Sequence, residues 1–226
     1  MLLEDLNWMD VENYLKHDDR MILVTGACEQ HGYLSLLADV KEPMAIATIV
    51  AEREQVLVAP PINFGVSPYF SAYPGTISIR AETFLRLTQD VVESLYRQGF
   101  KRILILNGHG GNKIAELLVE LANTHPGLKL DWVNWWLLPE VGQVAAAHGL
   151  EPGHANWMEN FRFTRVADVP DGVKPRVSMP VVADAASVRG LLGDGSYGGA
   201  YQAPDEVMDE LLETVVKVVQ QRLRRL

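Results

Sequence analysis

The order of apolar and polar residues predicts strands that alternate with helices along the chain. Unbroken apolar runs are typical of parallel strands buried on both faces, and they occur at 20–25, 56–59, 102–106 and 128–136. Elsewhere, apolar residues recur at the three- and four-residue spacing of amphipathic helices. The expected helices cover 8–16 with Asp10 as N-cap, 42–54, 82–97, the stretch from an Asn112 cap to about 124, 139–148, 153–163 and 204–226.

This alternation favours an α/β fold with a mostly parallel central sheet and helices on both faces. The sequence contains no internal repeat and no linker, so we expect one domain over residues 1–226. Two segments rich in Gly and Pro interrupt the pattern. We expect 63–78 to be a loop over one end of the sheet and 190–199 to be a flexible lid or rim loop. Ligands of such folds bind beyond the carboxyl ends of the strands.

Composition and charge narrow the class of protein. With 48% hydrophobic and 22% charged residues, the chain has the composition of a soluble globular protein. A net charge of −9 with scattered Lys and Arg argues against nucleic acid and against an anionic membrane surface as partners. No apolar stretch approaches the roughly 20 residues that span a bilayer. The N-terminus lacks a signal-peptide pattern, and the single Cys28 cannot form an internal disulfide, so we expect a cytoplasmic protein.

Histidine and acidic side chains follow the predicted strands or lie in turns, where they can meet at one edge of the sheet. They are Glu29, His31, Asp39, His109, His154 and Glu159. Imidazole and carboxylate together suit divalent Zn, Mn or Fe, and the lack of a cysteine cluster argues against a structural zinc cage. Glu29 and His31 lie two residues apart, so they point to the same side of an extended segment. His154 and Glu159 need non-helical geometry to face one site.

Other interpretations of these and neighbouring residues do not involve a metal. The glycines of 108–111 could cradle a phosphate ahead of a helix, although neither the P-loop nor the dinucleotide-binding pattern is present. Cys28 stands beside acidic residues, which disfavour a thiolate, so we expect it to be a packed residue. His17, His125 and His148 lie at predicted helix ends and need no functional role.

Four short motifs cover most of the chain from about Leu23 to Glu159. They are Gly26-Ala-Cys-Glu-Gln-His-Gly32, Phe64-Gly65 with Tyr73-Pro-Gly-Thr-Ile-Ser78, Asn107-Gly-His-Gly-Gly-Asn112, and Gly153-His-Ala155 with Glu159. In this order they resemble the creatininase family. The resemblance implies a three-layer α/β/α sandwich, a homohexamer built from dimers, a small-molecule substrate and a hydrolase site with two divalent ions.

The resemblance also implies a role for each candidate residue. One ion would be held by Glu29, Asp39 and His109, and the other by His31, Asp39 and Glu159, with Asp39 as the bridge. His154 would be the acid–base residue, so His154 and Glu159 are the expected catalytic residues. Tyr73, Gly110 and Trp157 are expected to line the substrate pocket.

We therefore expect a metal-dependent amidohydrolase that cleaves a C–N bond of a small amide, cyclic amides included. The chain departs from the family pattern in three places. Tyr33-Leu34-Ser35-Leu36 replaces Pro-His-Leu-Pro and brings Asp39 one residue early, Gly111 replaces a glutamate of creatininase itself, and Asn160-Phe161 replaces a small hydroxyl pair. These departures keep two alternatives open. One is a relative that hydrolyses a formamide, a cyclic ketone or a peptide terminus, and the other is a degenerate member that binds a small molecule or assembles without turnover.

Overall fold

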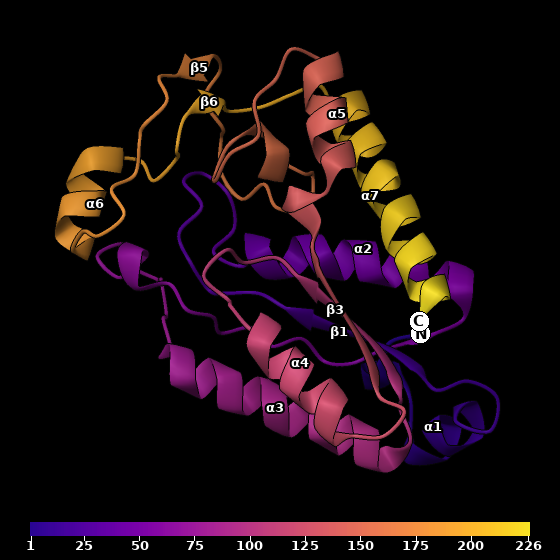
Figure 1. The fold of residues 1–226 in the computed structure, drawn as a ribbon. Coiled ribbons are helices and arrows are strands. Elements are labelled where there is room, and N and C mark those ends of the chain that lie inside the picture. Colours follow the sequence, from indigo (N-terminus) through magenta and orange to yellow (C-terminus); the bar gives the residue numbers. More distant parts are fainter.

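The structure, a computed structural model, describes residues 1–226 and is built on a sheet of four parallel strands. The strands are β1 (Arg20–Thr25), β2 (Leu57–Val58), β3 (Arg102–Asn107) and β4 (Lys129–Asn134), in the spatial order β2-β1-β3-β4 (Figure 1). All four predicted strands are present, although β2 and β4 are shorter than expected. The parallel sheet confirms the predicted α/β class.

Helices cover both faces of this sheet and make three layers (Figure 1). One face carries α2 (Ala38–Glu54), α5 (Pro139–Ala147) and α7 (Asp205–Arg225), and the other carries α3 (Ala81–Gln98) and α4 (Ala115–Thr124). Successive strand residues alternate between two cores, with Ile22 and Leu104 in the first and Met21 and Ile103 in the second. Because helices bury both faces, both sets of strand residues are apolar, which explains the unbroken apolar runs.

Some helices begin at other residues than predicted, because polar side chains near their starts make different hydrogen bonds from those expected. The short helix α1 (Trp8–Tyr14) is capped by Asn7, and Asp10 completes the capping box as its third residue. Helix α4 begins later than expected because the Asn112 side chain does not cap it. Instead, the Asn112 amide donates to the carbonyl oxygen of Gly26 at 3.1 Å, which ties the ends of two strands together.

The helix predicted over 153–163 is wrong, because this segment holds only a short 3-10 turn at Trp157–Glu159. Ala155 adopts a left-handed backbone conformation with φ of 53°, which interrupts any regular helix. The side chain of Asn156 then accepts a hydrogen bond from the N–H of Met158 at 3.0 Å and starts the 3-10 turn. The segment therefore has the non-helical geometry that His154 and Glu159 need to face one site.

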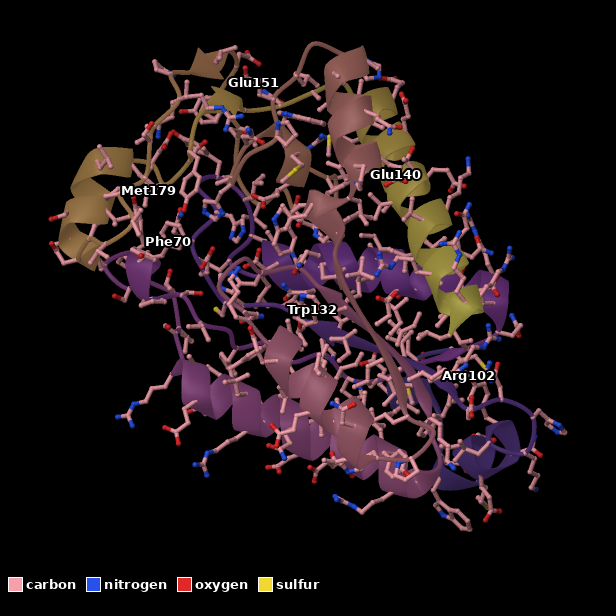
Figure 2. All side chains as sticks on the ribbon, in the orientation of Figure 1. Phe70, Arg102, Trp132, Glu140, Glu151 and Met179 are labelled. Carbon is pink, nitrogen blue, oxygen red and sulfur yellow. The ribbon has the colours of Figure 1, made fainter.

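Two irregular segments lie beyond the carboxyl ends of the strands. The first is the predicted loop over 63–78, which includes a 3-10 turn at Pro68–Phe70. The second holds helix α6 (Ala185–Leu192) and the antiparallel pair β5 (Val173–Lys174) and β6 (Gly199–Ala200) (Figure 1). Phe70 lies below α6, far from Arg102 at the start of β3 (Figure 2). None of the helices has the length and hydrophobicity to cross a membrane.

The first turn of α2 packs directly against the ends of β1 and β3. A Cβ atom on Gly26 would lie 2.4 Å from the carbonyl oxygen of Asp39, and one on Gly108 would lie 2.0 Å from the same oxygen. Only glycine permits so close an approach. Helix α2 begins at Ala38, earlier than predicted, so Asp39 belongs to its first turn and sits between the two strand ends.

This packing predicts that Gly108→Ala destabilises the protein by about 1–3 kcal/mol, because the new methyl group must displace the backbone of Asp39. The matched control is Gly142→Ala in α5, where a Cβ meets no atom within 4 Å. That control should raise stability by up to about 1 kcal/mol, since alanine favours a helix interior. Urea unfolding measures both changes, and equal effects of the two substitutions would contradict the packing.

Candidate metal centre

The register of the sheet brings two candidate segments to the same edge. Thr25 and Asn107, the last residues of β1 and β3, are direct partners in the parallel ladder. The Thr25 hydroxyl donates to the Asn107 side-chain oxygen at 2.9 Å, and the Asn107 amide donates to the carbonyl oxygen of His109 at 2.7 Å. The chain that follows each strand is thereby fixed, and Glu29 and His31 after β1 meet His109 after β3.

Asp39 lies at the centre of the cluster and offers one oxygen to each of two histidines. Its Oδ1 is 3.0 Å from His31 Nε2, and its Oδ2 is 2.8 Å from His109 Nδ1. Glu29 Oε2 lies 3.6 Å from His109 Nδ1, and Glu159 Oε2 lies 3.9 Å from His31 Nε2. The five side chains are buried. The structure therefore brings together every residue that was predicted as a metal ligand.

These residues form groups whose ligand atoms lie within 4.8 Å of one another. One group is Glu29, Asp39 and His109, and a second is His31, Asp39 and Glu159, so Asp39 is common to both. A third group, Glu29, His31 and His154, overlaps the first two. Each of these groups could hold one metal ion.

The far side of each histidine ring is held by a backbone carbonyl. His31 Nδ1 donates to the carbonyl oxygen of Glu29 at 3.1 Å, and His109 Nε2 donates to that of Val66 at 3.0 Å. In both rings the nitrogen that faces Asp39 is thereby left to act as a ligand. Such outer hydrogen bonds orient metal-ligating histidines and make them more basic.

The residues fit a metal centre because buried oxygen atoms in the cluster have no hydrogen-bond partner. Glu29 Oε2 and Asp39 Oδ2 are both buried and without a partner, since His109 Nδ1 approaches the second without hydrogen-bond geometry. Leaving a buried polar group unpaired costs about 1–3 kcal/mol, and more when it is charged. Cations between these oxygens would remove that cost, and the imidazole and carboxylate donors suit Zn, Mn and Fe.

Burial and mutual charge set the protonation of the cluster. Burial raises the pKa of Glu29 and of Glu159 to about 7, although nearby histidines oppose the shift. Burial alone would lower the pKa of His109, but the charges of Glu29 and Asp39 outweigh it and raise that pKa to about 9. For His31 the carboxylates likewise outweigh burial and hold its pKa well above the usual value. Without a metal, the cluster therefore carries protons at neutral pH.

His154 behaves differently from the other two histidines. Its ring stacks on Phe70 with centroids 4.9 Å apart and an interplanar angle of 12°. Burial, together with the positive charge on His31, holds the pKa of His154 well below its usual value. His154 Nδ1 lies 3.8 Å from Glu29 Oε1, which places this neutral ring at the edge of the cluster.

A cavity of about 500 Å³ opens above the cluster, a volume typical of small-molecule sites. Its walls come from the loop over 63–78, the turn after β3, the turn after β4, the segment 152–159 and Tyr197. The lining side chains outside the cluster are Val66, Ser67, Tyr69, Phe70, Trp136, Leu137, Pro152, Met158 and Tyr197, with backbone from Gly108, Gly110, Gly111 and Gly153. Gly110 thus lines the cavity as predicted. None of the lining residues is Lys or Arg.

The structure corrects two predicted pocket residues. Trp157 is fully buried in the core beneath the cavity, and its indole N–H donates to the carbonyl oxygen of Glu151 at 2.9 Å. The 3-10 turn directs Trp157 inward while Glu159 faces the cluster, where its Oε2 accepts from the Ala155 N–H at 2.5 Å. Tyr73 stands behind Phe70, with ring centroids 6.2 Å apart, and does not reach the cavity.

Sequence reasoning missed several residues that surround the cluster. Phe70 and Tyr197 lie in segments that were predicted as a loop and a rim, but no pattern marks which aromatic residue turns inward. Gln30 contacts His154. It lies in the Gly26–Gly32 motif between Glu29 and His31, and this position could have marked it as a site residue. Glu42 follows Asp39 on α2 and is buried with both carboxylate oxygens unpaired.

Comparisons with known proteins agree with this geometry. A family model for creatininase, described as creatinine amidohydrolase, matches residues 4–223. This chain belongs to the creatininase family. The match confirms the resemblance that the four sequence motifs indicated, and the relatives with curated names are hydrolases.

Two curated members of the creatininase family match about half of this chain. Creatinine amidohydrolase of Pseudomonas putida is 32% identical over 117 residues, which are 49% of this chain and 45% of that protein. Mycofactocin precursor peptide peptidase of Mycolicibacterium smegmatis is 33% identical over 121 residues, or 50% of this chain and 49% of that protein. The matches therefore span about half the length of these relatives.

A solved structure described as "Creatininase Mn" superposes over nearly the whole chain. Its TM-score is 0.84 at 25% identity, and the match covers 99% of this chain and 97% of that one. The fold of this protein is therefore that of the creatininase structures.

The protonated state of the cluster predicts that metal affinity rises with pH. A ligand must lose its proton before it binds a cation, so binding releases protons from Glu29, Glu159, His31 and His109. We expect Mn²⁺ affinity to increase from pH 6 to pH 8, with more protons released at pH 6, where both glutamates with a pKa of about 7 are still protonated. Isothermal titration calorimetry in buffers of different ionisation enthalpy measures both quantities. Affinity that does not change with pH would contradict this protonation pattern.

Glu42 gives a second prediction, for the metal-free protein. Burial, and then the charge of Glu159, raises the pKa of Glu42 well above its usual value. Stability is therefore lost as pH rises above the pKa of Glu42 in the unfolded chain, because the unfolded chain ionises first. Glu42→Gln should raise the free energy of unfolding by about 1–3 kcal/mol at pH 8 and by less at pH 5.

The matched control for Glu42 is Glu52→Gln, an exposed position on the same helix. We expect Glu52→Gln to change stability by less than about 0.5 kcal/mol at either pH. Urea unfolding in the presence of a chelator gives the comparison. A Glu42→Gln effect that shrinks between pH 5 and pH 8 would show that Glu42 does not carry the buried charge.

Proposed function

We propose that this protein is a metal-dependent amidohydrolase that cleaves a C–N bond of a small, uncharged amide, cyclic amides included. The observation that carries the proposal is Asp39, which directs its two oxygens to two histidines at the floor of a cavity. In this proposal one divalent ion is held by Glu29, Asp39 and His109, and the other by His31, Asp39 and Glu159. Mn, Zn and Fe are the proposed metals.

The residues around this centre have different proposed roles in catalysis. Two ions, if bound by these residues, would supply a nucleophilic water near neutral pH and would polarise a carbonyl group. Phe70, Tyr197 and Trp136 form apolar walls that exclude bulk water and hold a flat group above the cluster. His154, at the cavity wall beside Glu29, is the proposed catalytic residue that contacts the reacting group.

The lining of the cavity supports an uncharged substrate. No Lys or Arg lines the cavity to pair with a substrate carboxylate or phosphate, and the ionisable lining groups are carboxylates, histidines and two tyrosines. The volume of about 500 Å³ admits a small ring or the end of a peptide. The names of the two curated relatives include creatinine in one and a precursor peptide in the other, which supports an amide substrate without choosing between a ring and a peptide end.

We also propose a homohexamer in the cytoplasm as the working state. The family resemblance supports the assembly, and the single cysteine, which cannot form an internal disulfide, supports a reducing compartment. Sedimentation velocity of the metal-loaded protein measures the number of subunits, and a monomer at micromolar concentration would contradict the assembly.

Metal content and turnover together test the proposed function. Elemental analysis of the purified protein should find about two transition ions per chain, and Asp39→Asn should lose both, since both groups share that residue. His154→Ala should keep the two ions, but lower the hydrolysis of a panel of cyclic and linear amides by on the order of 10²–10³-fold.

The control for this test is His17→Ala at an exposed position in the turn after α1, which should keep both metal and activity. Amine release from the amide panel is the readout. A protein that holds two ions but hydrolyses no amide in the panel would favour the binding-only alternative. A protein that holds one ion or none after metal soaking would contradict the two-metal site.

A further inference from the structure

Gln30 stands between two metal-ligand candidates in sequence, yet its side chain contacts the third histidine of the site. The Gln30 side-chain nitrogen lies 2.8 Å from His154 Nε2. Behind His31 and His109, by contrast, the partners are the carbonyl oxygens of Glu29 and Val66, with the Ser67 hydroxyl oxygen also 3.2 Å from His109 Nε2. A carbonyl can only accept a hydrogen bond, whereas the NH₂ group of an amide can only donate one. The three histidines are therefore held in different ways.

The orientation of the Gln30 amide is fixed by two backbone groups. The N–H of Gly32 donates to Gln30 Oε1 at 3.0 Å, and Gln30 Nε2 donates to the carbonyl oxygen of Gly195 at 3.1 Å. If the amide were flipped, its NH₂ would face an N–H and its oxygen would face a carbonyl oxygen, so both hydrogen bonds would be lost. Gln30 Nε2 must therefore direct its second hydrogen at His154 Nε2.

Neighbouring aromatic rings hold the His154 ring in the orientation that contacts Gln30. Phe70 stacks on one face of the ring, and Tyr197 lies against it with centroids 5.0 Å apart. The backbone N–H of Tyr197 also donates to the carbonyl oxygen of His154 at 3.1 Å. Because His154 Nε2 accepts a hydrogen bond, it carries no proton, and the single proton of the neutral ring must be on Nδ1.

We propose that Gln30 is a positioning residue that locks His154 in the Nδ1–H tautomer, so that His154 is a hydrogen-bond donor and not a metal ligand. The lone pair on Nε2 is taken by Gln30, and Nδ1, the nitrogen near Glu29, carries the proton. His154 therefore has no free lone pair for a cation. This removes the group Glu29, His31 and His154 and leaves the two groups that share Asp39.

The tautomer also determines what His154 does in catalysis, an inference that rests on the proposed function. A neutral imidazole that gave up its Nδ1 proton would become an imidazolate, which is unfavourable in water at neutral pH. The ring therefore keeps its proton and donates a hydrogen bond to the oxygen that gains negative charge as water adds to the amide carbonyl. This role differs from the acid–base role that the family resemblance implies, and neutral histidines in other enzymes act as such donors.

Nitrogen-15 NMR of the zinc-loaded protein labelled at histidine tests the tautomer without any substrate. We expect the His154 signals, assigned by their absence in His154→Ala, to show a proton on Nδ1 and none on Nε2. His31 and His109 serve as internal references, with the proton on Nδ1 in the first and on Nε2 in the second. A proton on His154 Nε2 in the wild-type protein would overturn the proposal, whatever the variants do.

Gln30→Glu keeps the size of the side chain but replaces the NH₂ donor with an acceptor. In this variant we expect the His154 proton to move to Nε2, and turnover to fall by on the order of 10²–10³-fold in kcat with little change in KM. Gln143→Glu, an exposed position on α5, is the matched control and should change neither signal nor turnover. An unchanged His154 tautomer in folded Gln30→Glu would contradict the role of Gln30.

The two proposals fail in different ways. If the wild-type protein shows the Nδ1–H tautomer but hydrolyses no amide, the role of Gln30 stands and the proposed function fails. If the protein hydrolyses amides but His154 carries its proton on Nε2, the proposed function stands and the role of Gln30 fails.

Discussion

The contact between the Asp39 backbone and two glycines is the constraint on which the rest of the site depends. Gly26 and Gly108 end neighbouring strand segments, and only the absence of a side chain at both lets the carbonyl of Asp39 come so close. This contact seats the first turn of α2 on the carboxyl edge of the sheet. The Asp39 carboxylate is thereby held between His31 and His109, and no flexible loop is needed to carry it there.

The cost of this arrangement is electrostatic, and it explains why the site suits cations. Carboxylates and imidazoles are buried together, with oxygens of Glu29 and Asp39 left unpaired. A metal-free cluster limits the cost by taking up protons, which is why the pKa values of Glu29 and Glu159 lie near 7 and that of His109 near 9. A divalent ion would replace those protons, so metal binding and protonation would compete for the same atoms.

Hydrogen bonds behind the three histidines sort them into two kinds. Backbone carbonyls behind His31 and His109 leave the opposite ring nitrogen facing Asp39, whereas the amide of Gln30 places the proton of His154 on Nδ1, near Glu29. In the proposed site the same residue type would thus serve as ligand in two places and as donor in a third. The difference lies in whether a carbonyl oxygen or an amide NH₂ group lies on the far side of the ring.

The layered fold could be predicted from the order of the amino acids, because unbroken apolar runs are required when helices bury both faces of a parallel sheet. Most of the cluster could be predicted in the same way, since Glu29, His31 and His109 follow strands whose carboxyl ends must meet at one edge. The remaining features depend on contacts and backbone conformations that no sequence pattern marks. Trp157 turned into the core and His154 joined Glu159 because Ala155 takes a left-handed conformation, which no helical pattern predicts. The tautomer of His154 likewise depends on Gly195, a residue far along the chain that fixes the Gln30 amide through a single carbonyl oxygen.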